Sequence, residues 1–353
     1  MCLPLDRPDH DARRQKSMAS IKAIRMALAF VWMTVACGGG SGAPASKQGK
    51  GHVKRLKEGS FDARLERAEA LIGQGRAQEA KALLEALLAE KPKHSRALFD
   101  LGLACEALED RNCAKSAYER AVAEDPGFGE ALNNLGVLLR EEGKNEEAIQ
   151  LFRRAIEAHH DLASAHLNMG FALEDMGRLE EAIGAFRRAA ELDQKDASSR
   201  VSLGLLLLRQ GMREEALGHL RTAAGLTQSR AELAAIGSGL RRAGDPAMAL
   251  RVLREAVEAE GSPPPPGLRA ELALAEFATG ERKAAEESIH ALIRDHPSYA
   301  TAHRILGDML AAREAWAEAE GAYKECIRLE PQGEDASRAR ERLEELKRRK
   351  RKR

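Results

Sequence analysis

One pattern of small residues recurs about every 34 residues through most of the chain and limits what the chain can fold into. In its clearest copy, residues 131–157, two amphipathic stretches with apolar residues at helical spacing are joined at Gly143. Gly136 and Ala148 are small, so two helix backbones can approach closely there, and Gly143 can adopt the left-handed conformation that ends a helix. One hairpin of this size cannot bury its apolar face alone, so the fold requires copies of it.

The copies follow one another along the chain, beginning near residues 61, 95, 129, 163, 197, 230, 266 and 300. The small residue of the first helix is Ala68, Gly102, Gly136, Gly170, Gly204, Gly237, Ala273 and Gly307 in turn, and the alanine of the second helix is Ala80, Ala114, Ala148, Ala182, Ala216, Ala249, Ala285 and Ala319. A composition of 44% hydrophobic, 31% charged and only 4% aromatic residues suits stacked helices and offers little material for a large β-sheet core.

The repeat length and the positions of the small residues resemble the tetratricopeptide repeat family, from about Phe61 to Gly333. The resemblance implies an all-α fold: a right-handed α-solenoid of about eight helix hairpins, closed by a polar capping helix. The expected divisions are a leader and signal peptide (residues 1–36), a lipid-anchor cysteine with a Gly/Ser/Lys-rich tether (37–60), repeats one to six (61–262), a Pro-rich junction with repeats seven and eight (263–333), and a capping helix with a basic tail (334–353).

The N-terminal segment has the layout of a secretion signal, whether translation starts at Met1 or Met18. A positive stretch precedes the apolar run 26–36, which is too short to span a bilayer. The run ends in Thr34-Val35-Ala36-Cys37, which resembles the lipobox of bacterial lipoproteins but has threonine where leucine is usual. The resemblance implies that Cys37 is lipidated and becomes the N-terminus.

The residues that follow Cys37 indicate in which part of the cell envelope the protein lies. Gly38 is not the aspartate that commonly retains bacterial lipoproteins in the inner membrane, so the resemblance implies the periplasmic side of the outer membrane. Two alternatives stay open: cleavage after Ala45, which would release a soluble periplasmic or secreted protein, and retention of the uncleaved segment as an anchor.

Chemistry-bearing motifs are not found in the sequence. It contains no Gly-rich phosphate loop, no nucleophile elbow and no zinc-protease motif. His159, His160, Asp161 and His166 come nearest to a metal cluster, but their spacing does not bring them to one helix face. With a net charge of +1, no global field selects nucleic acid or membrane as a partner. We therefore expect a protein without catalytic residues, metal or cofactor, and no nucleic-acid partner.

Two other features have a structural and a functional interpretation. Cys105 and Cys113 flank the turn of repeat two, where Glu109-Asp110 replaces the usual glycine; they are either a disulfide that pins this hairpin or two small buried residues. The last seven residues, KRRKRKR, are either a solvated tail or a contact for anionic lipid, lipopolysaccharide or nucleic acid.

The predicted binding surface lies on the first helices. The resemblance implies a concave groove that binds an extended peptide or a partner helix, with asparagines two residues before the small glycine holding the ligand's backbone. Alternatively, these amides bond within their own repeat, and the apolar residues beside them pack against the next turn of the superhelix. The predicted groove residues, in repeats two to five, are Phe99, Asp100, Leu103, Asn133, Asn134, Val137, Arg140, Asn168, Phe171, Leu205 and Arg209.

The leading functional hypothesis is a non-enzymatic scaffold lipoprotein that assembles an envelope complex. Lipoproteins that resemble this layout serve pilus and secretin assembly, gliding motility or outer-membrane biogenesis, and the sequence does not choose among these processes. The alternative is a soluble or secreted accessory subunit that docks substrates for a separately encoded enzyme.

Overall fold

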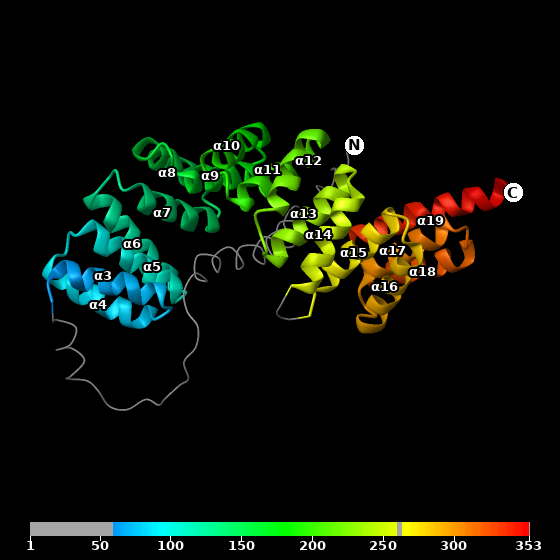
Figure 1. Ribbon diagram of the computed structural model, residues 1–353, viewed down its shortest axis with the longest axis horizontal. Helices are drawn as coiled ribbons and strands as arrows, with labels where there is room; N and C mark the ends of the chain where they lie inside the picture. The colour runs from blue at the N-terminus through cyan, green and yellow to red at the C-terminus, as the bar shows by residue number, and fades with distance from the viewer. Residues whose placement is uncertain (1–58, 260–262, 353) are drawn as a thin grey trace, which may run out of the picture. The chain divides into compact units, whose positions relative to one another are not determined.

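The computed structural model describes residues 59–259 and 263–352, and all regular structure in that part of the chain is α-helical (Figure 1). The predicted signal peptide, Cys37 and nearly all of the tether lie outside the described residues. The helices are α3 (Phe61–Gly73), α4 (Ala77–Glu90), α5 (Ser95–Ala107), α6 (Arg111–Glu124), α7 (Gly129–Glu141), α8 (Asn145–Ala158), α9 (Ala163–Asp175), α10 (Leu179–Leu192), α11 (Ala197–Arg209), α12 (Arg213–Ala224), α13 (Arg230–Ala243), α14 (Pro246–Glu258), α15 (Pro266–Ala278), α16 (Arg282–Asp295), α17 (Ala300–Ala312), α18 (Trp316–Leu329) and α19 (Glu334–Lys352).

These helices form hairpins in two compact units, residues 1–194 and 195–353, hereafter unit 1 and unit 2. The first helices of the eight hairpins begin at residues 61, 95, 129, 163, 197, 230, 266 and 300, the starts that the repeat pattern predicts. Each first helix packs on its second helix, and several first helices also contact the first helix of a neighbouring repeat, such as α7 with α9 in unit 1 and α15 with α17 in unit 2. The all-α tetratricopeptide solenoid class is confirmed.

The small residue of each first helix makes room for a side chain of the second helix. A Cβ atom added at Gly136 would lie 2.6 Å from Cε1 of Phe152, and one added at Gly307 would lie 2.6 Å from Cε1 of Tyr323. The sequence pattern explained the glycine by close approach of two backbones. The structure shows that the glycine accommodates the large residue that lies sixteen positions later, at the same register in each repeat.

Hairpin turns share one backbone conformation even where glycine is missing. Gly143 has a φ of 80° in its turn, and Glu109 and Glu314 adopt φ values of 59° and 64° in the turns of repeats two and eight. A side chain in this left-handed region is strained. In repeat two the structure joins Cys105 and Cys113 across the turn by a disulfide, with their Cα atoms 5.7 Å apart.

The C-terminal helix is longer than expected. The predicted cap ended near Lys347, with a tail beyond it, whereas α19 continues to Lys352. Lysine and arginine are good helix formers, and cations at a helix C-terminus interact favourably with the helix dipole. These two effects explain why the basic run extends the helix.

Candidate partner-binding site

Nine of the eleven predicted groove residues lie in unit 1, on the first helices α5, α7 and α9. Four of them are buried: Phe99, Asp100, Asn133 and Arg140. The other five are partly exposed, and we call them the amide–apolar row: Leu103, Asn134, Val137, Asn168 and Phe171. Leu103, Val137 and Phe171 each follow the small glycine of their repeat, so one register supplies the apolar members of the row.

The asparagines of the row belong to a hydrogen-bonded chain that crosses three repeats. Asn168 Nδ2 donates to Asn133 Oδ1 at 3.0 Å, and Asn133 Nδ2 donates to Asn134 Oδ1 at 3.2 Å. Asn134 Nδ2 donates to the Tyr118 hydroxyl at 3.3 Å, and that hydroxyl donates to Glu106 Oε2 at 2.8 Å. The amides therefore bond between repeats as well as within one. An amide has two donors and two acceptor lone pairs, so one donor bond from each leaves capacity for a ligand.

Arg140 makes its contacts within unit 1. Its Nε lies 2.6 Å from Asp175 Oδ2, and its guanidinium lies over the Phe171 ring at 5.0 Å from the ring centroid. The edge of Phe171 in turn packs on Phe186, with ring centroids 5.1 Å apart. The Arg140 side chain therefore pairs with an acidic side chain of its own unit and lies over the Phe171 ring.

Asp100 is the most deeply buried residue of the predicted groove, at 1% exposure. Arg96 Nε lies 3.3 Å from Asp100 Oδ1 and also contacts Glu69 Oε1 at 3.1 Å, so one guanidinium serves two carboxylates. Neither carboxylate oxygen of Asp100 accepts a well-aligned hydrogen bond within the described residues. Burial raises the pKa of Asp100 to about 7, against the lowering effect of Arg96, and the neighbouring Glu69 raises it further.

Leu205 and Arg209 lie on α11, in unit 2, so the row is described for repeats two to four only. Leu205 packs, partly buried, against the core of unit 2, and Arg209 is exposed. The assignment of both residues to the groove, in repeat five, stays a prediction.

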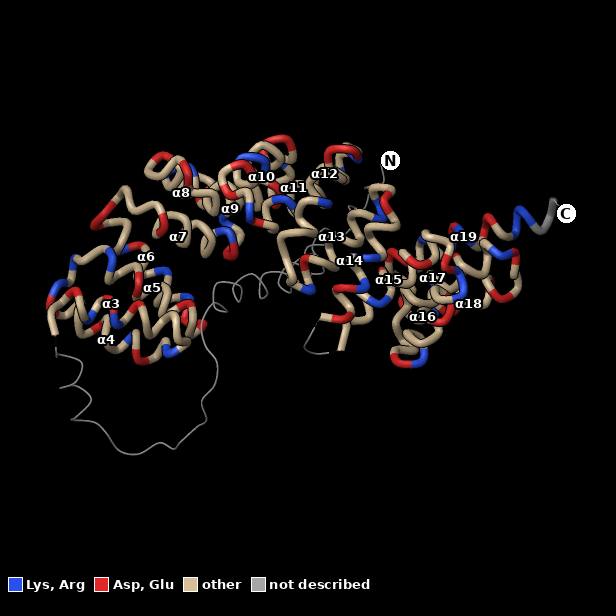
Figure 2. The backbone as a smooth tube through the Cα atoms, viewed as in Figure 1, with Lys and Arg blue, Asp and Glu red and all other residues tan. Residues whose placement is uncertain are grey.

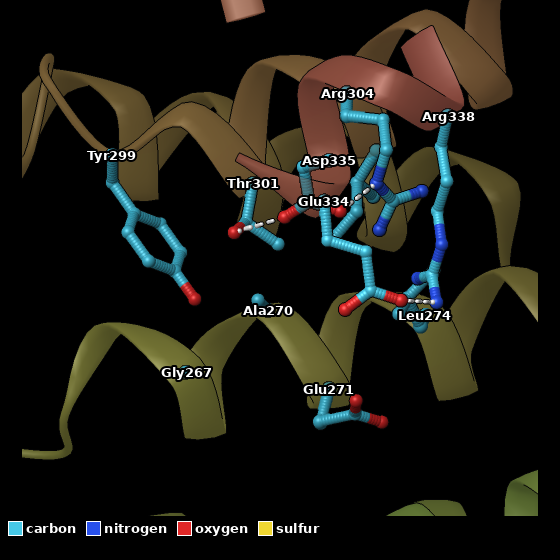
Figure 3. A pocket seen from close by; sticks show the side chains of 11 residues that line it. Gly267, Ala270, Glu271, Leu274, Tyr299, Thr301, Arg304, Glu334, Asp335 and Arg338 are labelled. Carbon is cyan, nitrogen blue, oxygen red and sulfur yellow. Dashed lines mark hydrogen bonds and ion pairs between the residues drawn. The ribbon is translucent and has the colours of Figure 1, made fainter. Parts of the chain in front are cut away.

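A second hollow, in unit 2, was not among the predicted sites. Its volume is about 400 Å³, and it is lined by α15, α17 and the capping helix α19 (Figure 3). Figure 3 shows Tyr299 at one side, Arg338 with Glu334 at the other, and Gly267, Ala270 and Glu271 below. Glu271 lies two residues before the small Ala273, which is the spacing that Asn134 and Asn168 have in the row, so the repeat pattern could have predicted this site. The predicted groove residues ended at repeat five.

Ion pairs fill much of the wall of this hollow. Arg304 Nε lies 2.5 Å from Asp335 Oδ1, and Thr301 Oγ1 donates to Asp335 Oδ2 at 2.6 Å. Arg338 Nη2 pairs with Glu334 Oε1 at 2.5 Å. Burial raises the pKa of Tyr299, which keeps its hydroxyl protonated as a donor. The contacts of Asp335 with Thr301 and Arg304 attach the capping helix to repeat eight.

No group of three or more possible metal-ligating side chains occurs within residues 59–259 and 263–352. Across the same residues, the structure has no helix with the length and apolarity needed to cross a membrane.

Comparison with known proteins supports the repeat assignment. Two family models, both described as tetratricopeptide repeat, match the chain: one at residues 65–110, 107–163 and 270–334, the other at residues 163–196. The solved structure of PilF from Pseudomonas aeruginosa matches with a TM-score of 0.51 and 20% identity, over 58% of this chain and 92% of that one. The APC/C hetero-tetramer Cut9–Hcn1 matches with a TM-score of 0.51 and 17% identity, over 83% of this chain and 56% of that one. No curated protein matches the sequence. At these identities the structural matches show the fold alone.

Proposed function

Since the chain belongs to the tetratricopeptide repeat family, we propose that it is a non-enzymatic scaffold that binds a protein partner along the amide–apolar row. We further propose that a lipid on Cys37 holds it at the periplasmic face of the outer membrane, where it assembles an envelope complex. Pilus or secretin assembly, gliding motility and outer-membrane biogenesis are the candidate processes.

The observation that carries the binding proposal is the composition of the row. Its apolar members, Leu103, Val137 and Phe171, stay partly exposed although the core of unit 1 is otherwise well buried. Asn134 and Asn168 lie among them with unused hydrogen-bonding capacity. An extended peptide or a helix with apolar side chains fits such a surface, because its apolar groups leave water while its polar groups find amide partners.

Val137→Glu tests the row with little risk to the fold. Val137 is partly exposed, whereas Phe171 packs on Phe186 and Arg140, so a change at Phe171 would confound binding with stability. The native protein and the variant are crosslinked and affinity-purified from the envelope fraction. We expect Val137→Glu to reduce capture of the partner by about tenfold or more, because it places a charge in a desolvated interface.

Met176→Glu is the matched control. Met176 is 42% exposed at the end of α9, so this change adds the same charge at an apolar position outside the row. Capture by Met176→Glu should equal that by the native chain, and both variants should keep the native helical circular dichroism. Equal capture by Val137→Glu and the native chain would show that the partner binds elsewhere.

The location is tested separately by metabolic labelling with a palmitate analogue. The native chain should incorporate the label and fractionate with the outer membrane, and Cys37→Ala should do neither. An unlabelled native chain in the soluble periplasmic or secreted fraction would instead favour the accessory-subunit alternative. The partner recovered by crosslinking then identifies the process.

A further inference from the structure

The capping helix α19 changes character at Leu346. The side chains that pack on the repeats occur up to and including this residue. Ala336, Ala339 and Leu346 are buried, and the partly buried Leu343 packs on the core that includes repeat eight. After Leu346 the chain contains only cations, KRRKRKR, and the helix nevertheless continues to Lys352. Figure 2 shows the start of this run in blue, just before the grey end of the chain. The described side chains of this run, Lys347 to Arg349, are exposed and supply no apolar residue to the contact that caps the repeats.

Ion pairing changes at the same point. Up to Lys347, three of the four cations on this helix pair with acids on it: Arg338 with Glu334 at 2.5 Å, Arg342 with Glu345 at 3.0 Å, and Lys347 with Glu344 at 2.7 Å. Beyond Lys347 no acid follows in the sequence. Among the described side chains, Arg348 makes no ion pair, and the Arg349 guanidinium lies over the Trp316 ring at 5.9 Å from its centroid.

The adjacent cations on the last part of α19, residues 347–352, repel one another, since residues four apart on the same face carry the same charge. At a rise of about 1.5 Å per residue they occupy about 10 Å of helix. An anionic surface relieves this repulsion, so the segment gains from contact with one. No apolar residue lies within it, so it would remain at the level of charged head groups and not insert.

We propose that residues 347–353 dock unit 2 on an anionic phospholipid surface. Lysine and arginine attract the phosphate groups of lipids and of nucleic acids alike, so the choice of a membrane over a nucleic acid rests on the proposed location. The segment then forms a second membrane attachment, at the opposite end of the chain from Cys37.

Vesicle sedimentation tests the segment without the lipid anchor. The full chain carrying Cys37→Ala is mixed with phosphatidylcholine vesicles containing about one third phosphatidylglycerol, an anionic surface of the kind that attracts polybasic segments. Combining Arg348→Gln, Arg349→Gln and Arg351→Gln should weaken binding by about 100-fold, since each cation near an anionic surface contributes about fivefold. Binding of the unsubstituted tail should weaken steeply with added salt.

The matched control removes three cations from the body of the protein. Lys93, Arg111 and Lys283 have side chains that are 82%, 67% and 93% exposed, so Lys93→Gln, Arg111→Gln and Lys283→Gln change net charge equally. This control should keep native binding, and vesicles of phosphatidylcholine alone should not distinguish the three proteins. Equal losses in both triple variants would overturn the proposal, as would tighter binding to a DNA duplex at the same phosphate concentration. Since Cys37 is absent here, the palmitate-labelling result stands independently.

Discussion

Hairpins two and eight share one arrangement of tyrosine, glycine and acid, but the charged groups near that acid differ. Each packs a tyrosine against the glycine of its first helix, Tyr118 on Gly102 and Tyr323 on Gly307. Each tyrosine hydroxyl reaches an acid on that first helix, Glu106 at 2.8 Å and Asp308 at 2.7 Å. Each turn also has a glutamate where most repeats have glycine.

The two hairpins differ in the groups that compensate the partly buried acid and the strained turn. In hairpin eight, Asp308 is 2.6 Å from Arg304 Nη1 and 3.7 Å from Arg342 Nε, so cations balance it. In hairpin two, burial raises the pKa of Glu106, and its hydrogen bond from Tyr118 lowers that pKa only in part. Hairpin two has a disulfide across its turn, and hairpin eight has none. The same hairpin therefore forms whether or not cations balance its acid and whether or not a disulfide crosses its turn.

Glycine-to-alanine changes should have the largest effect and should affect both hairpins alike. A Cβ at Gly307 would lie 2.6 Å from Tyr323, and one at Gly102 would overlap the Tyr118 ring still more. We expect Gly307→Ala and Gly102→Ala each to lower the free energy of unfolding by about 3 kcal/mol, because an overpacked core must displace a large side chain. Chemical denaturation measures the loss; a loss below about 1 kcal/mol would mean that the rings move aside easily.

Reducing the disulfide should affect hairpin two alone. The bond closes a loop with a sequence separation of 8. Loop-closure entropy predicts a loss of about 2.5 kcal/mol in the unfolding free energy of this hairpin on reduction. Amide hydrogen exchange resolves the two hairpins: α5 and α6 should exchange faster under reductant, and α17 and α18 should not change. A Cys105→Ala, Cys113→Ala double variant should be insensitive to reductant.

Unit 1 should lose stability between pH 4 and pH 7 because of Asp100. Its folded pKa is raised from 3.8 to about 7, so its stabilising contribution is full below the unfolded pKa and is lost as pH rises through the folded pKa. At about 1.4 kcal/mol per pKa unit, the rise from 3.8 to about 7 corresponds to a loss of about 4 kcal/mol. Asp100→Asn should flatten this dependence in exchange rates of α3 and α5. A dependence unchanged by Asp100→Asn would assign it to Glu106, whose pKa burial also raises.

Repeat boundaries were predictable because they depend on local sequence. Small residues at fixed spacing define both helices of a hairpin, and all eight first helices begin at the predicted residues. The chain of amides from Asn168 to Asn134 and the contact of Arg140 with Asp175 were not predictable. They join different repeats, so they depend on the angle and register between hairpins, which the repeat spacing does not determine.

Other features had a signal that the sequence analysis did not use. Glu314 occupies the glycine position of its turn just as Glu109 does, but only Glu109 was recognised. The burial of Asp100 is harder to foresee, because a groove position and a buried position share the same spacing. The last turns of α19 were expected to be a tail because of their charge, although their helix propensity is high.

The turn glutamates offer the smallest and most specific test of the comparison. Glu109 and Glu314 adopt φ values of 59° and 64°, which glycine adopts without strain. Glu109→Gly and Glu314→Gly should each raise the free energy of unfolding by about 1 kcal/mol, the relief of one left-handed side chain. Gly143→Ala, at a φ of 80°, should lower it by a similar amount.

The two glutamates should also differ from each other once the disulfide is reduced. If the bond holds the turn of hairpin two in place, reduction lets the strained turn open, so Glu109→Gly should recover part of the stability lost on reduction. Glu314→Gly should give the same gain with and without reductant, because hairpin eight has no such bond among its described residues. Equal gains at both turns in both conditions would show that the disulfide and the turn conformation act independently.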